Sequence, residues 1–300
     1  MKAIRKNQFE GHKGPLYALS LFKDGILSGG SDRKVVEWNL KKGEGGVLAN
    51  AAAAIISLCY LDKRDLLLVG QMEGGVHLID LKARKEIKYL KGHQNYIFDI
   101  QYLPKKEELI FASGDGSFSV WSAKSFERLY QQQLCQQKLR KLELSEDGSE
   151  LLISRGDGII SRFKTDDYSE KAQIKGDAGF NVVRYAADGE TILAGDKQAH
   201  LHSIDKRSGK ILKSLPAHYW PIYDLQFSPS GKYFATASRD KTIKVWDPKE
   251  LKVLERIEGR EYGAHSHSVN ALLWIDETTF ISTGDAGMVK QWQIDASLNS

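Results

Sequence analysis

Short runs of alternating apolar and polar residues recur along this chain, and the clearest set lies between Ala217 and Asp247. Such alternation is typical of strands that bury one face. It predicts three strands, at 222–227, 233–238 and 242–246, separated by the turn sequences Ser-Pro-Ser-Gly and Arg-Asp-Lys. A fourth strand is predicted at 253–257, which completes a unit of four short strands.

This unit repeats at nearly constant spacing. A large apolar residue, most often Trp, ends the third strand of each copy, at Trp38, Ile79, Trp121, Phe163, Ile204, Trp246 and Trp292. Successive positions differ by 41, 42, 42, 41, 42 and 46 residues. A period of about 40 to 45 residues is that of a four-stranded propeller blade. The sequence therefore predicts an all-β, seven-bladed β-propeller of four-stranded antiparallel blades. We expect one domain over residues 1–300, with repeat units at 10–48, 49–90, 91–132, 133–174, 175–215, 216–257 and 258–294.

Particular polar residues accompany the period. In the clearest copy they are His218, Ser238, Asp240 and the pair Trp246-Asp247, and on these residues the chain resembles the WD-repeat family of β-propellers. Histidines at matching positions open copies one, three, six and seven, and matching turn aspartates follow them: His12, His93, His218 and His265, then Asp32, Asp115, Asp240 and Asp285. The resemblance covers essentially the whole chain.

The resemblance implies a buried network in each well-preserved copy, in which His bonds the turn Asp and a Ser or Thr that also meets the Trp indole N–H. The expected members are His93, Ser113, Asp115 and Trp121 in copy three, His218, Ser238, Asp240 and Trp246 in copy six, and His265, Thr283, Asp285 and Trp292 in copy seven. Copy one has Gly30 at the hydroxyl position, so we expect its network to lack that group. Copies two, four and five lack the residue set, and we expect them to depend on packing.

The ends of the chain carry a further prediction. The third strand of the last copy is predicted to end near Ile294, six residues before the end of the sequence. The family resemblance implies that an N-terminal segment then completes the last blade. We expect residues 3–9 to be this closing strand.

Composition changes this picture little. The net charge is +4, from 43 basic and 39 acidic residues, so nucleic acid is not indicated as a partner. The apolar stretch 48–61 is interrupted by Asn50 and Ser57, which argues against membrane insertion. The charged N-terminus lacks the apolar core of a signal peptide, and two cysteines in different copies fit reduced thiols. We expect a cytoplasmic protein, or a nuclear one in a eukaryote, that is a monomeric propeller within a larger assembly.

Some residue sets resemble catalytic or metal-binding groups. His218, Ser238 and Asp240 superficially resemble a hydrolase triad, but the set recurs at the blade period, whereas a catalytic site is normally single. The pairs His200/His202 and His265/His267 supply only two of the three or four ligands that a zinc site needs. We predict no catalytic residue, no cofactor and no metal, and hence no enzymatic activity.

The predicted function is protein binding. In this family, the loops before each first strand and the turns between second and third strands meet on a top face that commonly binds peptides or partner domains. Copy seven also has an insertion, 258–267, before its first strand. Aromatic and Arg residues are enriched at interface hot spots. The predicted contact residues are Tyr17, Met72, Tyr96, Phe98, Arg140, Lys197, Tyr219, Trp220, Tyr223, Arg239, Tyr262 and Asn270.

Two alternatives stay open. The propeller could bind RNA or another polyanion, for which the basic group Lys138, Arg140 and Lys141 is a minor indication, since such groups are more often a solvated face. It could also be an adaptor subunit that uses its blade edges or its bottom face. The sequence does not indicate the partner, the pathway, the host lineage or the oligomeric state.

Overall fold

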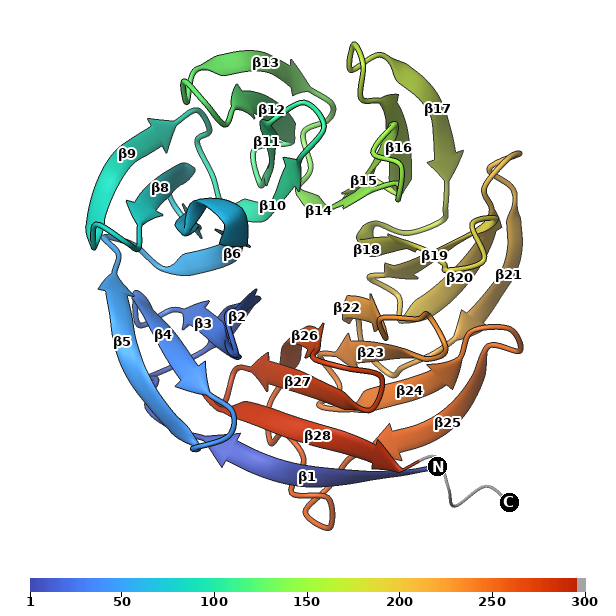
Figure 1. Cartoon of the computed structure of the whole chain (residues 1–300). Helices are drawn as coiled ribbons and strands as arrows, with labels where there is room; N and C mark the ends of the chain where they lie inside the picture. The colour runs from blue at the N-terminus through green and yellow to red at the C-terminus, as the bar shows by residue number, and fades with distance from the viewer. Residues whose placement is uncertain (296–300) are drawn as a thin grey trace. The chain divides into compact units, whose positions relative to one another are not determined.

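A computed structural model describes residues 1–295 of the 300-residue chain, and in this range the strands form seven four-stranded sheets. The predicted fold class is confirmed: the protein is all-β, with the seven four-stranded antiparallel blades of a β-propeller (Figure 1). Residues 296–300, which the predicted domain range includes, lie outside the described residues.

The chain divides into two compact units. One contains residues 51–183, and the other contains residues 1–50 together with those from 184 onward. The prediction of a single domain over the whole chain stays a prediction, and each unit is described by itself.

The unit of residues 51–183 contains blades two, three and four. Their strands are β6 (Ile55–Leu61), β7 (Leu66–Gln71), β8 (Gly75–Asp80) and β9 (Lys85–Lys91); β10 (Ile97–Leu103), β11 (Glu108–Ser113), β12 (Ser117–Ser122) and β13 (Arg128–Gln133); and β14 (Leu139–Leu144), β15 (Glu150–Arg155), β16 (Ile159–Lys164) and β17 (Glu170–Lys175). A short 3-10 helix, η1 (Asp62–Arg64), joins β6 to β7.

The other unit contains blades one, six and seven. Their strands are β2 (Leu16–Phe22), β3 (Gly25–Gly30), β4 (Lys34–Asn39) and β5 (Glu44–Asn50); β22 (Ile222–Phe227), β23 (Phe234–Ser238), β24 (Ile243–Asp247) and β25 (Lys252–Ile257); and β26 (Val269–Trp274), β27 (Thr279–Gly284), β28 (Val289–Asp295) and β1 (Lys2–Phe9). Blade five is the sheet β18 (Phe180–Tyr185), β19 (Thr191–Asp196), β20 (His200–Asp205) and β21 (Ile211–Pro216), and the unit boundary falls within β18.

The burial of each strand follows its position in the blade. The second strands β7, β11 and β15 are buried at every residue, because the sheet and its neighbours cover them on all sides. The fourth strands are mostly exposed, as in β9 and β17. The alternation in the sequence therefore reflects strands whose two faces differ in solvent access.

The N-terminal strand completes the seventh blade, as predicted. β1 pairs with β28 in antiparallel register from Lys2 opposite Asp295 to Phe9 opposite Val289. The observed strand begins one residue before the predicted range 3–9.

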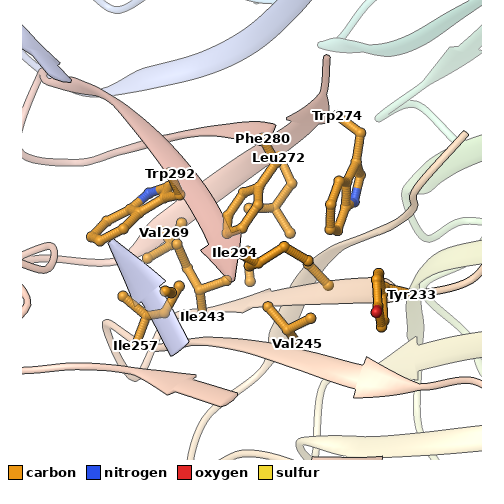
Figure 2. Close-up of a cluster of buried hydrophobic side chains, with 13 residues drawn as sticks. Tyr233, Ile243, Val245, Ile257, Val269, Leu272, Trp274, Phe280, Trp292 and Ile294 are labelled. Carbon is orange, nitrogen blue, oxygen red and sulfur yellow. The ribbon is translucent and has the colours of Figure 1, made fainter. Parts of the chain in front are cut away.

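Apolar side chains fill the space between blades six and seven (Figure 2). Trp274, Phe280 and Trp292 from blade seven pack with Ile243 and Val245 from blade six in one buried cluster. Large buried aromatics contribute much of the burial energy of such clusters.

A buried carboxylate also joins neighbouring first strands. Asp224 on β22 accepts a hydrogen bond from the backbone N–H of Leu272 on β26 at 2.9 Å. In the other unit, Asp99 on β10 accepts from the backbone N–H of Leu142 on β14 at 3.0 Å. Packing and these bonds together hold the first strands, and hence the loops that precede them.

Candidate functional site

The His network of blade six forms, but with a different hydroxyl from the one predicted. His218 Nδ1 lies 3.0 Å from Asp240 Oδ2, and its Nε2 lies 2.7 Å from Thr236 Oγ1. The Trp246 indole N–H donates to the same Thr236 oxygen at 2.8 Å. Ser238, the predicted member, donates instead to the carbonyl of Trp220 at 2.9 Å. The prediction of Ser238 was wrong because Thr236, two residues earlier on the same face of β23, lies between the imidazole and the indole, whereas Ser238 lies at the end of the strand and bonds to the loop.

Blade three differs from prediction in the same way. His93 Nδ1 lies 3.2 Å from Asp115 Oδ2, and Ser119 lies 2.7 Å from its Nε2. Ser119 also accepts the Trp121 indole N–H at 2.8 Å. Ser113 donates to the Asn95 carbonyl, so its predicted contact with His93 was wrong. The second-strand residue opposite Ser119 is Phe111, and the hydroxyl therefore comes from the third strand.

Blade one has a complete network, so the expected gap was wrong. His12 Nδ1 lies 2.9 Å from Asp32, and Ser28 contacts both His12 Nε2 and the Trp38 indole N–H at 2.7 Å. Gly30 has another role, because a Cβ there would lie 2.2 Å from the Pro15 carbonyl oxygen. The glycine allows the loop to approach the strand closely.

Blade seven is incomplete, contrary to prediction. His265 Nε2 lies 2.7 Å from Ser282 Oγ, which also accepts the Trp292 indole N–H at 2.7 Å. Thr283 donates instead to the Met288 carbonyl, and Asp285 accepts from Asn270.

The reason is the position of Asp285, which lies one residue, and not two, after the strand pair that precedes the turn. Val269 pairs with Gly284 in blade seven, as Ile222 pairs with Ser238 in blade six. The residue two after this position is Asp240 in blade six and Ala286 in blade seven. Blade seven therefore has no carboxylate at this turn position, and within residues 1–295 the buried Nδ1 of His265 has no hydrogen-bond partner.

Two of the copies expected to depend on packing have polar networks of their own. In blade four, the Arg155 guanidinium pairs with Asp157 and donates to Ser161 Oγ at 3.1 Å, and so replaces the missing His. In blade five, His202 Nε2 lies 2.9 Å from Asp196 Oδ2. The expectation that these two blades depend on packing alone was wrong. The polar groups come from the ends of the second strands, at Arg155 and Asp196, and from the third strands, at Ser161 and His202.

The pKa values of His218, Asp240 and His265 are all lower than their ordinary values. Burial lowers the pKa of His218, although Asp240 acts to raise it, so the imidazole is neutral at pH 7. Burial acts to raise the pKa of Asp240, but hydrogen bonds from His218 and Thr242 outweigh it and hold that pKa below its ordinary value. Burial, with a smaller contribution from Lys290, lowers the pKa of His265 to about 3.

The geometry of the His218 set is that of a structural network. An ionised Asp240 can only accept, so His218 Nδ1 donates to it and Nε2 accepts the Thr236 O–H. The buried Thr236 oxygen is already bonded to Trp246, and Ser238 does not contact the imidazole. Across residues 1–295, no three His, Cys, Asp or Glu side chains are grouped as metal ligands.

Three of the predicted contact residues of blade six are exposed and lie together: Tyr219, Trp220 and Arg239. Tyr219 and Trp220 lie in the loop before β22 and are 80% and 55% exposed. The Arg239 guanidinium lies 5.0 Å from the Trp220 ring centroid, and that of Arg256 lies 5.7 Å from the Tyr219 centroid. We call Tyr219, Trp220, Arg239 and Arg256 the blade-six surface.

A second group lies in the unit of residues 51–183. Tyr96 and Phe98 are stacked with their centroids 5.3 Å apart. Arg140 lies over Phe98 at 4.4 Å, and the Lys138 ammonium lies within 5.7 Å of both rings. We call Tyr96, Phe98, Lys138 and Arg140 the blade-three surface.

The remaining predicted residues are less alike. Met72 and Lys197 are exposed in turns, whereas Tyr17 and Tyr223 are half-buried on the first strands β2 and β22. Asn270 donates to the Leu16 carbonyl and to Asp285, and the Tyr262 hydroxyl donates to Glu255 at 2.6 Å. These contacts give the polar groups of Asn270 and Tyr262 intramolecular roles.

Two members of these surfaces were not among the predicted contact residues. Lys138 was interpreted as part of a solvated basic group, and Arg256 lies on the fourth strand β25. Their spacing from the aromatics carries no repeat signal, since each contact depends on how a loop folds over a neighbouring strand. Within residues 1–295, no helix is long and apolar enough to cross a membrane.

Comparison with known proteins agrees with the architecture. The family model described as WD domain, G-beta repeat, matches residues 84–122 and 209–247, which belong to the segments that form blades two to three and five to six. Together with the seven repeated sheets, and with the His, hydroxyl and Trp networks of blades one, three, six and seven, these matches support a WD-repeat family for the chain.

Individual relatives are distant. The chain is 31% identical over 179 residues to eukaryotic translation initiation factor 3 subunit I of Neurospora crassa. This match covers 55% of this chain and 51% of that protein. It is 22% identical over 258 residues to the human serine-threonine kinase receptor-associated protein, covering 85% of this chain and 71% of the relative. It is 23% identical over 250 residues to bovine WD repeat-containing protein 55, covering 80% and 64%. The match thus spans about half the length of the translation factor subunit.

Proposed function

We propose that this protein is a non-enzymatic scaffold for protein–protein interaction, and that it binds a peptide or partner domain through the aromatic and cationic residues of the blade-six and blade-three surfaces. The observation that carries the proposal is the adjacent pair Tyr219 and Trp220, 80% and 55% exposed, each with an Arg guanidinium against its ring. Exposed aromatics cost free energy in water unless a partner covers them, and Trp, Tyr and Arg dominate interface hot spots.

The relatives support the general class. One is named a subunit and another a receptor-associated protein, so both names describe assembly with other proteins. The residue composition of the blade-three surface, with two stacked aromatics under two cations, supports the same function for the unit of residues 51–183. A single top face that joins these surfaces, a monomeric state and a cytoplasmic or nuclear location stay predictions.

Binding through the blade edges is the competing proposal, and one observation favours it. Leu129 on β13 and Leu212 on β21 are 55% and 62% exposed on outer strands. Isolated exposed leucines are common on soluble proteins, whereas Trp, Tyr and Arg are enriched at interface hot spots, so we favour the blade-six and blade-three surfaces.

Affinity purification from the native host with matched variants tests the proposal. One variant carries Tyr219→Ala and Trp220→Ala, a second carries Tyr96→Ala and Phe98→Ala, and the control carries Leu129→Ala and Leu212→Ala. Thermal unfolding checks that each variant remains folded. We expect at least one of the two aromatic variants to lose partners that the control retains. If both aromatic variants retain every partner and the control loses partners, the protein binds through its blade edges.

A further inference from the structure

The blade-six surface is held in place by the network beneath it. The Ser238 hydroxyl donates to the Trp220 carbonyl at 2.9 Å, and the Tyr219 N–H donates to Asp240 Oδ2 at 3.0 Å. The Arg239 N–H donates to the Pro221 carbonyl at 3.1 Å. The aromatic loop and the Arg239 turn are therefore fixed to each other by three hydrogen bonds, which reduces the entropy that a ligand must remove on binding.

The two arginines of this surface differ in their ion pairs. Arg256 forms an ion pair with Glu258 at 2.7 Å, and the Asp240 carboxylate is bonded to His218. Arg239 is exposed and forms no ion pair with a carboxylate of residues 1–295. A guanidinium that lies over an aromatic ring still has N–H donors in its own plane, and these can bind a carboxylate through two parallel hydrogen bonds.

We propose that the blade-six surface binds an acidic segment of a partner protein, with a partner carboxylate on Arg239 and a neighbouring apolar side chain on the rings of Trp220 and Tyr219. This inference rests on the proposed function and adds the chemistry of the partner. Aromatic rings and Arg can also bind single-stranded nucleic acid. Arg256 is paired with Glu258, so on the blade-six surface Arg239 is left to bind a single carboxylate. A strand of phosphates needs a continuous basic groove, so a peptide with a carboxylate fits better.

Fluorescence anisotropy with three labelled probes tests this chemistry. The probes are a peptide that alternates Glu and Leu, the same peptide with Gln in place of Glu, and an oligouridine. The variants are Arg239→Gln, Trp220→Ala and the control Lys249→Gln, which removes one charge from the turn at the opposite end of β24. Thermal unfolding verifies the fold of each.

We expect the Glu–Leu peptide to bind more tightly than the Gln–Leu peptide. Arg239→Gln should weaken it at least about tenfold, Trp220→Ala should also weaken it, and Lys249→Gln should leave it unchanged, because hot-spot residues carry most of the binding energy. Equal binding of the two peptides, no binding of the Glu–Leu peptide, or insensitivity to Arg239→Gln overturns the inference. Tighter, Arg239-dependent binding of oligouridine overturns it in favour of nucleic acid.

The two proposals fail in different ways. Host partners that depend on Trp220 but are retained by Arg239→Gln would leave the scaffold function in place and remove the acidic segment. Partners that depend on neither the blade-six nor the blade-three surface would contradict the proposed function itself.

Discussion

Substitution of Ala286 by Asp should stabilise the protein by completing the network of blade seven. In blades one, three and six, the His Nδ1 lies 2.9 to 3.2 Å from a turn carboxylate. Ala286 occupies the equivalent turn position, and the buried His265 Nδ1 has no hydrogen-bond partner in the part of the chain that the structure describes. The substitution Ala286→Asp places a carboxylate where three other blades already accommodate one.

The expected magnitude follows from the cost of the missing bond. A buried donor without an acceptor costs about 1 to 3 kcal/mol, and part of this is recovered when an acceptor is supplied, so we expect a gain of about 1 to 2 kcal/mol. With an unfolding entropy of roughly 2 cal/mol/K per residue, a chain of this length should melt about 2 to 3 °C higher. Urea and thermal unfolding measure both quantities, with Ala286→Asn as the uncharged control.

The dependence on pH supplies a second measurement. The pKa of His265 is about 3 in the folded protein because burial disfavours the charged ring, against an ordinary value of 6.5. Between these values the unfolded chain binds a proton that the folded chain does not, so the stability falls as the pH decreases below about 6.5. At pH 5 this loss is about 2 kcal/mol from His265 alone. A carboxylate beside the ring raises its folded pKa, so Ala286→Asp should gain more stability at pH 5 than at pH 7.

A double-mutant cycle provides the decisive control. With His265→Leu in the background, Ala286→Asp loses its partner and should give no gain. Either of two results would show that His265 is not stabilised by the added carboxylate: no gain from the single substitution, or an equal gain with and without His265.

Three further predictions concern stability in denaturant. Trp246→Ala should cost about 3 to 5 kcal/mol because it empties a buried aromatic site, whereas Ile79→Val should cost only about 1 kcal/mol; equal losses would contradict the importance of the Trp anchor. Thr236→Val should cost about 1 to 3 kcal/mol, since it removes the hydroxyl shared by His218 and Trp246, and an unchanged unfolding midpoint would show that this hydroxyl is not needed. Deletion of residues 1–9 should strongly lower the melting temperature because β28 loses its paired strand, and an unaltered melting curve would argue against closure of blade seven by β1.

The fold could be predicted from spacing because a blade is a local unit. Its four strands are consecutive in sequence, so the length of the repeat, the strand alternation and the turn residues all lie within one window of the chain. The closing strand followed from the same register, since only the last copy lacked a fourth strand of its own.

The hydroxyl residues of the His networks could not be predicted from the spacing of the repeat. Ser28, Ser119, Thr236 and Ser282 lie in strand interiors, at paired positions of the second and third strands, and not beside the turn where the family pattern drew attention. A small polar residue inside an otherwise apolar strand was the available signal. The loss of the carboxylate in blade seven was hidden because Asp285 stands one residue from the required position, and only the pairing of Val269 with Gly284 reveals the shift.

The blade-six surface also combines residues that the sequence could place with residues that it could not. The aromatics Tyr219 and Trp220 could be placed before a first strand by counting from His218, so the sequence was sufficient to identify that loop. The positions of Arg239 and Arg256 over those rings depend on how the loop folds against the next turn and the outer strand. Periodic spacing is a property of the chain and survives in the sequence, whereas hydrogen-bond partners and stacked charges are set by strand register and loop packing, which arise only when distant residues meet in the folded protein.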